Sequence, residues 1–387
     1  MSYLSHLICG VCKGVFDAHQ VQTYCTSCKA PLLACYDLSA ARRKLDRDFF
    51  HTRRSGMWRW RELLPVFDTQ AIITLGEGDT PLLALPRLAT QYHLPNLYLK
   101  DESFNPTGSF KARGLSAAVS KAKELGIEKL VIPTAGNAGG ALAAYAARAG
   151  LTASIFMPED TPLSNIEECR ISGATIVLVE GLISDAAKLA GEKAQLEGYF
   201  DVSTFKEPYR TEGKKIMGYE LAETFNWTLP DVIVYPTGGG TGLIGMWKAF
   251  AEMQELGWLE SPKKPRMVAV QASGCAPVVK AFTTGSSSCE FWTNAHTIAS
   301  GLRVPKSFAD RLILHDIRES NGTAVEVDDA EIITAQKLLA STEGIFAAPE
   351  GAATLAGLIK LLQTGDILLD EKIVLFNTAT GLKYLSQ

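Results

Sequence analysis

The chain has 387 residues, enough for two or three domains of ordinary size, since a domain typically contains about 100–200 residues. Its 47% hydrophobic and 21% charged residues are typical of a soluble globular protein and exclude disorder for most of the chain. The net charge of −4 excludes the global cationic field that attracts nucleic acid or an anionic membrane surface.

Residues 1–36 are the first predicted element, a small module without helical periodicity. Two Cys-x-x-Cys pairs, Cys9/Cys12 and Cys25/Cys28, stand about a dozen residues apart. The chain starts without the basic and apolar segments of an export signal, so we expect a reducing cytoplasm, where paired cysteines indicate metal. Four thiolates suit tetrahedral zinc, and a site without an open position is structural. A ribbon that grips nucleic acid, or two unrelated reduced pairs, are the alternatives.

The rest of the chain predicts an α/β protein. The charged, aromatic segment 38–65 is expected to be partly helical, and from about residue 95 short β-branched runs alternate with helical segments. The predicted strands are 96–102, 129–136, 152–158, 174–181, 231–240, 266–273 and 372–381, and the predicted helices include 110–126, 137–150 and 183–198. This alternation indicates mostly parallel sheets covered on both faces. No run approaches about 18 apolar residues, so no membrane span is expected.

The stretch 101–114 places Lys111 just inside a predicted helix, after a Pro–Thr–Gly turn. The positive end of the helix dipole disfavours an ammonium there and favours a neutral amine or an imine. This is the state that Schiff-base chemistry needs. A solvated lysine on a helix is the other interpretation.

Two further strand-to-helix junctions are candidate anion sites. At 134–139 (TAGNAG), backbone N–H groups can bind a carboxylate and Asn137 offers an amide to a ring hydroxyl. At 237–242 (TGGGTG), successive glycine amides at a helix start predict a phosphate site, although the spacing is that of neither a P-loop nor a dinucleotide fingerprint. A capped turn and a tight turn without ligand are the respective alternatives.

The last predicted strand is followed by a fifth motif, FNTATGLK at 376–383. Thr378 or Thr380 can place a hydroxyl at the end of the sheet. A neutral hydroxyl opposite a pyridine nitrogen leaves that nitrogen unprotonated, which limits the electron sink and favours elimination or replacement at the β or γ carbon.

Taken in this order, the lysine, asparagine and glycine turns and the C-terminal threonine resemble the fold type II pyridoxal-phosphate enzymes, the tryptophan synthase β-like family. Within it the chain is most similar to the threonine synthase group, over essentially all 387 residues. The cysteine module followed by APLLACYDL resembles the zinc ribbon ahead of some bacterial and archaeal members. Other matching segments are GMWRWRELLP, GEGDTPLLALPRL, ESFNPTGSFKARG, PYRTEGKKIMGYEL and EGIFAAPEGAAT.

The resemblance implies two lobes and a role for each motif. It implies a large lobe of residues 37–104 and 216–387, a small mobile lobe of 105–215 and a site in the cleft between them. Lys111 is the implied Schiff-base lysine and acts as the base at Cα and Cβ of the substrate. The implied cofactor contacts are Lys111, Phe110, Asn137, Gly238, Gly239, Gly240, Thr241, Gly242 and Thr378, and the implied substrate contacts are Thr134, Ala135, Gly136, Ser109, Arg113 and Asn165.

The implied reaction converts O-phosphohomoserine and water to threonine and phosphate, with pyridoxal phosphate as cofactor, structural zinc in the ribbon and a homodimer as the default assembly.

One difference from the threonine synthase pattern concerns substrate binding: Glu159 and Asp160 stand where many threonine synthases have lysine and serine. Asn165, Arg170, Ser109 or Arg113 can compensate. The segment after the last strand, TATGLK at 378–383, also differs from the TGxGLK that is commoner in this family. The alternatives are β-replacement on O-phosphoserine, as in cysteate synthase, and deamination of threonine or serine. Another hypothesis is a nucleic-acid-binding protein whose enzyme body is degenerate. The net negative charge and the intact motif around Lys111 argue against it.

Overall fold

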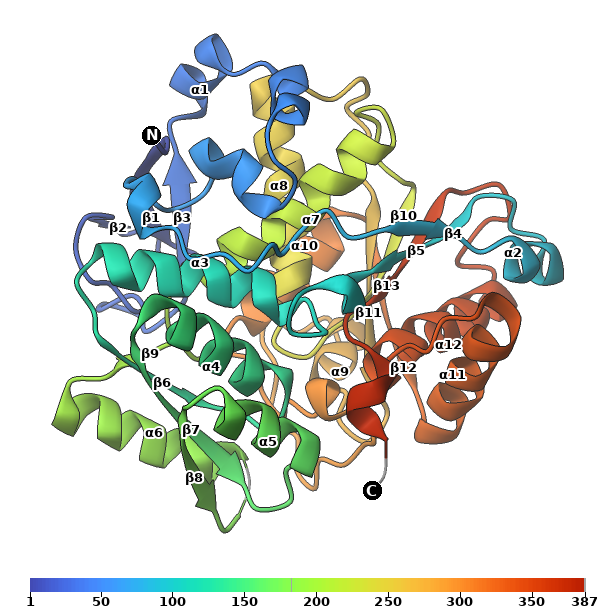
Figure 1. The fold of residues 1–387 in the computed structure, drawn as a ribbon. Coiled ribbons are helices and arrows are strands. Elements are labelled where there is room, and N and C mark those ends of the chain that lie inside the picture. Colours follow the sequence, from blue (N-terminus) through green and yellow to red (C-terminus); the bar gives the residue numbers. More distant parts are fainter. Residues whose placement is uncertain (182, 386–387) are drawn as a thin grey trace. The chain divides into compact units, whose positions relative to one another are not determined.

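The computed structural model describes residues 1–181 and 183–385 (Figure 1). The chain divides into two compact units. Unit 1 contains Met1–Asp79, Asn105–Ile216 and Glu255–Gly257, and unit 2 contains Thr80–Phe104, Met217–Gln254 and Trp258–Gln387. The boundary at residue 216 falls inside a helix, α7 (Arg210–Thr224).

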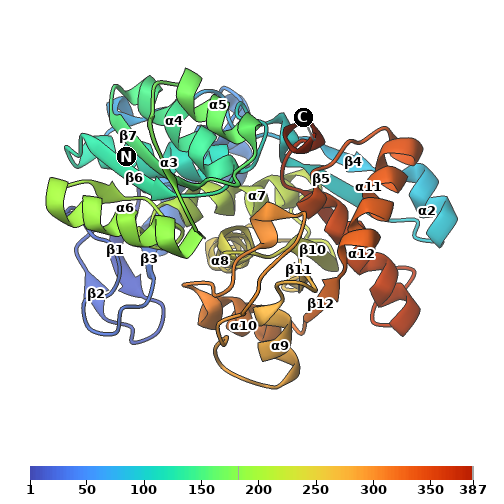
Figure 2. The same ribbon diagram turned by 90° about the horizontal axis from the view of Figure 1, so that it is seen from below.

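Unit 1 is built on a four-stranded parallel sheet of order β8-β7-β6-β9. In β6, Leu130 and Ile132 belong to a core shared with α3 and α4, whereas Val131 belongs to a core shared with α6. Successive side chains of a strand point to opposite faces, so the buried, apolar residues 130–132 of this strand are covered by helices on both sides (Figure 2). The elements are α3 (Lys111–Glu124), β6 (Lys129–Pro133), α4 (Asn137–Ala149), β7 (Thr152–Pro158), α5 (Leu163–Ile171), β8 (Thr175–Val179), α6 (Ile183–Glu197) and β9 (Phe200–Asp201).

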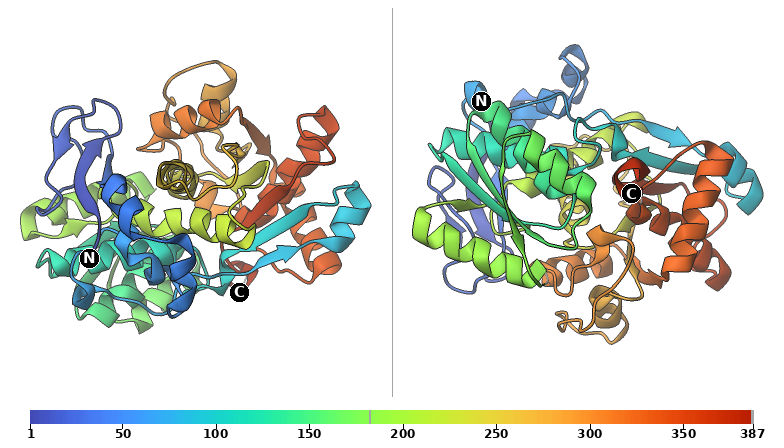
Figure 3. Two further views of the ribbon diagram at one scale, coloured as in Figure 1. Left: turned by 90° about the horizontal axis from the view of Figure 1, so that it is seen from above. Right: turned by 60° about the horizontal axis from the view of Figure 1, so that its bottom comes forward.

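A second sheet of unit 1, which we call the ribbon (residues 4–36), is antiparallel with order β2-β1-β3 (Figure 3). Its strands are β1 (Leu4–Cys9), β2 (Val15–Phe16) and β3 (Leu32–Tyr36). The ribbon core includes Leu7 and Ala34 and continues into Ala118 of α3 and Tyr209. The Tyr36 hydroxyl donates to Glu212 in the first turn of α7 at 2.8 Å. The ribbon therefore packs on α3 and on the start of α7.

The segment after the ribbon is partly helical, as its composition predicted. It forms α1 (Leu38–Lys44), η1 (Arg47–Thr52), η2 (Met57–Leu63) and η3 (Thr69–Ala71). Asp37 caps α1 by accepting the N–H of Ala40. Trp60 is fully buried against Phe50, with ring centroids 4.3 Å apart, so these short turns are held by aromatic packing.

Unit 2 is built on a six-stranded sheet of order β12-β11-β10-β13-β5-β4, in which only β4 is antiparallel to its neighbour. Val232 and Val234 of β10 belong to the core that includes residues of α11 and α12. Helices α9 and α10 contact β11 (Figure 2). The elements are β4 (Leu82–Ala84), α2 (Pro86–Tyr92), β5 (Leu97–Asp101), η4 (Glu102–Phe104), β10 (Val232–Pro236), α8 (Thr241–Leu256), β11 (Arg266–Ala272), α9 (Pro277–Thr283), η5 (Ser300–Leu302), α10 (Asp310–Glu319), β12 (Thr323–Val327), α11 (Asp329–Glu343), α12 (Pro349–Thr364), β13 (Ile373–Asn377) and η6 (Gly381–Tyr384).

The α/β class and the mostly parallel sheets are confirmed. Each predicted strand and helix contains an observed element of the same type, with ends shifted by a few residues. The predicted lobe boundaries at 36, 104 and 215 stay a prediction. Among the residues described, no helix combines the length and apolar character needed to cross a membrane.

Candidate active site

Three helix starts gather at one edge of the unit 1 sheet. α4 follows β6 and α5 follows β7, so both begin at the carboxyl ends of parallel strands. α3 leads into β6 and packs against α4, so its start lies at the same edge. Ligands of open α/β sheets bind at this edge, and the first N–H groups of these three helices, which no side chain caps, can bind anions there.

The lysine turn ends where α3 begins, at Lys111, as predicted. Gly108 has a positive φ of 63° and donates its N–H to the Asn105 carbonyl at 2.7 Å, which closes the turn. Phe110 is the N-cap residue of α3, but its side chain makes no capping hydrogen bond. The Lys111 Nζ lies 4.4 Å from the centre of the Phe110 ring. The Ser109 hydroxyl is fully buried and lacks a protein hydrogen-bond partner, so it is left available for a bound group.

The loop 74–79, which contains most of the GEGDT motif at 76–80, supports the lysine turn. Glu77 is fully buried and accepts from the Tyr145 hydroxyl at 2.5 Å and the Trp58 indole N–H at 3.0 Å. The next residue, Gly78, donates its N–H to Asn105 Oδ1 at 3.2 Å. Burial and the Glu77 charge raise the pKa of Tyr145, so this phenol stays a donor. Sequence reasoning quoted the motif but assigned Glu77 no role.

The asparagine turn starts α4 at Asn137, as predicted. The N-cap residue Gly136 is extended and offers no side chain, and its N–H binds the Thr134 hydroxyl at 3.2 Å. A Cβ at Gly139 would lie 2.8–3.0 Å from three side chains, including Thr134 and Cys169. Close packing therefore fixes the first turn of α4, and Thr134, Ala135, Gly136 and Asn137 lie together at this edge.

The acidic residues of the loop before α5 differ from Asn165 in their exposure to solvent. Glu159 and Asp160 are exposed, whereas Asn165 is 2% exposed and its Oδ1 lacks a protein hydrogen-bond partner. The nearby Thr161 hydroxyl is also buried without such a partner. The buried polar groups of this loop, on Thr161 and Asn165, are thus neutral. The carboxylates of Glu159 and Asp160, which would repel a phosphate, are exposed to solvent.

The start of α7 brings buried charges to α3, which sequence reasoning missed. Arg210 and Lys214 are at most 1% exposed, as is Glu207, whose carboxylate accepts the N–H groups of Tyr209 and Arg210. A Cβ at Gly213 would lie 2.0 Å from the Arg113 carbonyl oxygen. Burial raises the pKa of Glu207 to about 7, against the opposing effect of Arg210. The sequence analysis quoted the segment PYRTEGKK, residues 208–215, as a family match but assigned its charged residues no role.

In unit 2, the predicted phosphate turn connects β10 to α8. Gly240 has a φ of 80°, and Cβ atoms at Gly238 and Gly242 would lie 2.2 Å from the Gly301 carbonyl oxygen and 1.9 Å from the Tyr235 hydroxyl. Ser307 donates to the Gly239 carbonyl at 3.1 Å. The glycines are thus required by close protein contacts, which hold the N–H groups at the start of α8 in place.

Thr378 lies at the end of β13, the strand next to β10. The register pairs Val234 with Leu375, so the carboxyl ends of both strands reach the same edge. Asn377 is fully buried and donates to Asp101 at 2.8 Å, which fixes the strand end. Thr378 is 5% exposed. Unit 2 therefore brings together the glycine turn and Thr378, whose predicted roles stay predictions.

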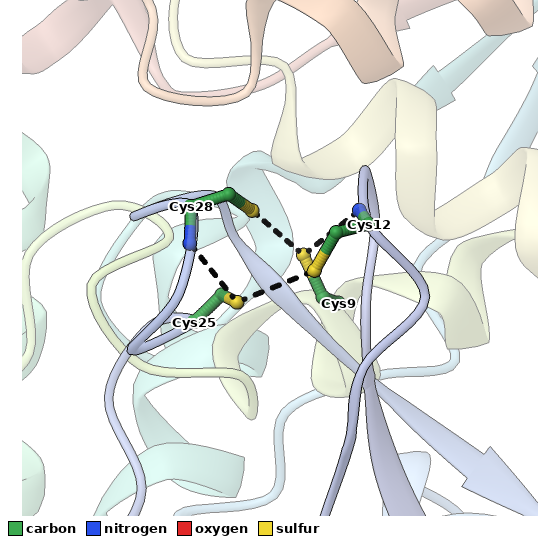
Figure 4. A group of neighbouring side chains, drawn as sticks. All are labelled: Cys9, Cys12, Cys25 and Cys28. Atoms are coloured by element: carbon green, nitrogen blue, oxygen red, sulfur yellow. Dashed lines mark hydrogen bonds between the residues drawn. The ribbon is translucent and has the colours of Figure 1, made fainter.

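The four ribbon cysteines converge as the spacing predicted (Figure 4). Their Sγ atoms all lie within 4.8 Å of one another, with Cys9–Cys28 at 3.4 Å and Cys12–Cys25 at 3.5 Å. Sulfurs bound tetrahedrally to zinc at about 2.3 Å would be ~3.8 Å apart, so the geometry fits that ion.

Each unit separately carries groups that can bind parts of pyridoxal phosphate. Unit 1 has a lysine and a buried hydroxyl without a protein partner at the start of α3, and unit 2 has a glycine turn with a threonine at a neighbouring strand end. The family model and the relatives reported below define a pyridoxal-phosphate-dependent lyase of fold type II. A family model described as pyridoxal-phosphate dependent enzyme matches residues 73–379. The chain belongs to this family.

The similar proteins include threonine synthases. That of Methanocaldococcus jannaschii is 35% identical over 376 residues, which cover 97% of this chain and 92% of the relative. That of Methanosarcina acetivorans is 36% identical over 379 residues, covering 98% and 92%. At this coverage the similarity includes most of the ribbon.

Solved structures confirm the fold alone. Maize serine racemase has a TM-score of 0.70 and 22% identity, covering 85% of this chain and 94% of its own. A threonine deaminase isoform from Solanum lycopersicum has a TM-score of 0.66 and 24% identity, covering 78% and 79%. The fold thus hosts several reactions, and it does not choose among them.

Proposed function

We propose that the chain is a threonine synthase that converts O-phosphohomoserine and water to threonine and phosphate. The similarity to threonine synthases at 35–36% identity over 97–98% of the chain carries this proposal. The buried Thr161 hydroxyl, which can donate to a phosphate oxygen, and the exposed positions of Glu159 and Asp160 support a phosphate ester as substrate. The expected homodimer stays a prediction.

The proposed roles follow the motifs. Lys111 holds the cofactor and exchanges protons with the substrate carbons, Asn137 binds the ring hydroxyl and Thr378 faces the ring nitrogen. The turn 238–242 receives the cofactor phosphate, and 134–136 receives the substrate carboxylate. Pyridoxal phosphate, when bound, supplies the electron sink for carbanions at the substrate. Ser109, Arg113 and Asn165 are proposed substrate contacts.

The overall chemistry balances without a further reactant. The bond between Cγ and the phosphate oxygen breaks, and the hydroxyl of water is added at Cβ. One proton moves in net terms from Cβ to Cγ, a transfer that we assign to the Lys111 amine. The remaining proton of water leaves with phosphate.

The ribbon is proposed to hold structural zinc through Cys9, Cys12, Cys25 and Cys28. Four thiolates leave no open position for a substrate. The ribbon shares its core with Ala118 of α3 and with Tyr209, so the ion stabilises the surroundings of the helix that begins at Lys111.

Substrate choice is tested by phosphate release from O-phosphohomoserine and from O-phosphoserine, with the purified holoenzyme. Release from O-phosphohomoserine, with threonine as product, is the expected result. Release from O-phosphoserine alone would refute the proposal in favour of β-replacement, and ammonia release from threonine or serine without phosphate turnover would favour a deaminase.

Gly238→Ala is expected to weaken the binding of pyridoxal phosphate by about tenfold or more. The new Cβ would lie 2.2 Å from the Gly301 carbonyl oxygen, so the turn must shift. Equilibrium titration of the visible absorbance gives the dissociation constant. Gly191→Ala on α6 is the matched control, because a Cβ there contacts nothing within 4 Å. Unchanged affinity in Gly238→Ala would contradict the assignment of this turn.

A further inference from the structure

The carboxylate of Glu77 in unit 1 is fully buried among four hydrogen-bond donors. Its Oε2 accepts from the Tyr145 hydroxyl at 2.5 Å and from the Leu75 N–H at 3.0 Å. The Thr74 hydroxyl donates to the same oxygen at 3.2 Å, and the Trp58 indole N–H donates to Oε1 at 3.0 Å. A buried carboxylate is stable only where donors replace water, so the loss of Glu77 would leave several buried donors without this partner.

Two of these donors connect Glu77 to helices α3 and α4. Tyr145 belongs to α4, which begins at the asparagine turn. The Trp58 N–H also donates to Ser116 Oγ on α3 at 2.8 Å, and that hydroxyl donates to the Ile73 carbonyl at 2.7 Å. The carboxylate therefore binds α4 directly and reaches α3 through the indole, and α3 and α4 also pack against each other.

The backbone beside Glu77 holds the lysine turn. Gly78 donates its N–H to Asn105 Oδ1 at 3.2 Å, and the Asn105 carbonyl accepts the Gly108 N–H at 2.7 Å. A Cβ at Gly78 would lie 2.4 Å from the Met57 backbone nitrogen, so the loop is packed tightly on η2. Fixed by η2 and by the Glu77 carboxylate, the loop binds the chain just before α3 begins.

We propose that Glu77 is a positioning residue that keeps α3 and α4 at a fixed spacing, so that Lys111 and Asn137 reach one cofactor ring together. In pyridoxal phosphate the carbonyl carbon and the ring hydroxyl are attached to adjacent atoms of a rigid ring, so a displaced helix would lose one of the two contacts. The inference rests on the proposed roles of Lys111 and Asn137 and adds the side chain that fixes their spacing.

The test measures the dissociation constant of pyridoxal phosphate by equilibrium titration of the visible absorbance of the full-length protein. Glu77→Gln keeps the size of the side chain but turns an amide NH₂ group toward donors, and it should weaken binding about tenfold or more. Tyr145→Phe removes one donor and should weaken binding about threefold. Glu128→Gln changes an exposed carboxylate after α3 and is the matched control, for which we expect wild-type affinity.

Combination with Asn137→Ala separates positioning from a loss of stability. Because Glu77 acts by placing the Asn137 amide at the ring, Glu77→Gln should weaken binding only about threefold or less in the Asn137→Ala protein. Glu77→Gln alone should also displace the maximum of the visible band in the same direction as Asn137→Ala. Ala186→Gly lowers stability in the core on the α6 face of the sheet and should change neither affinity nor spectrum.

Wild-type affinity in folded Glu77→Gln and Tyr145→Phe, or a tenfold effect of Glu77→Gln that persists in the Asn137→Ala protein, would overturn the inference. Should Glu77→Gln not fold, Tyr145→Phe serves for the same comparison. A wild-type protein that takes up no pyridoxal phosphate would instead refute the proposed function, and none of these measurements uses a substrate.

Discussion

Lys111→Ala is expected to eliminate the cofactor linkage and to lower turnover by about 10³-fold or more. The alanine lacks the amine that holds the cofactor and moves the substrate protons. Borohydride reduction of the wild-type holoenzyme followed by peptide mass spectrometry should find the cofactor on Lys111, and the variant should lack the visible band near ~410 nm expected for a Schiff base.

The control for this variant is Lys123→Ala, in the last turn of the same helix and exposed to solvent. It should keep the wild-type spectrum and rate. A Lys111→Ala protein that retains covalent cofactor on another lysine, or that turns over at the wild-type rate, would show that the assignment of Lys111 is wrong.

Cys25→Ser is expected to release the zinc and to lower the melting temperature by at least about 5 °C. Cys25 is fully buried, and its sulfur lies 3.5 Å from that of Cys12, so serine both weakens the ligand set and leaves a buried hydroxyl. The ribbon core continues into Ala118 and Tyr209, so the loss should reach α3.

Metal analysis and thermal melting, with and without a chelator, check this prediction. Cys35→Ser is the matched control, because Cys35 lies in the ribbon strand β3 but outside the four-cysteine cluster. It should keep both the zinc and the stability. Wild-type zinc content in Cys25→Ser, or a metal-free wild type of equal stability, would contradict a structural metal site.

The local features of this fold could be predicted because they depend on neighbours in sequence. The β-branched runs gave the buried strands, and the turn before Lys111 gave the start of α3. The Cys-x-x-Cys spacing placed four sulfurs together because two short turns suffice to bring them into reach. The roles of Lys111, Asn137 and Thr378 came from the family resemblance, because the local sequence pattern does not determine what a residue binds.

The long-range contacts could not be predicted in this way. Lys214 reaches Phe110 only because Gly114 lets α7 approach, and nothing in the spacing of the two segments shows that contact. Arg113, a predicted substrate contact, is fully buried where Gly213 packs on its backbone, and its predicted role stays untested. α3 is buried on nearly all sides, so helical periodicity gives no exposed face from which to judge its residues.

Glycines of the turn 237–242 have two possible physical causes, namely ligand binding and close packing within the protein. Phosphate binding was predicted from the glycines of the turn 237–242. The structure shows that Gly238 and Gly242 are also required by close contacts with the Gly301 carbonyl and the Tyr235 hydroxyl. A glycine-rich turn is therefore a weaker sign of a ligand than its composition suggests. The position of the turn at a helix start, beside the strand that ends at Thr378, gives the stronger indication.

The most direct test of the central claim is to turn over O-phosphohomoserine with the holoenzyme in water enriched in ¹⁸O and to analyse both products by mass spectrometry. We predict threonine that carries one ¹⁸O atom in its β-hydroxyl and phosphate that carries none, because the Cγ–O bond breaks and water is added at Cβ. Phosphate labelled with ¹⁸O together with homoserine, or a 2-oxo acid in place of threonine, would contradict the proposed reaction.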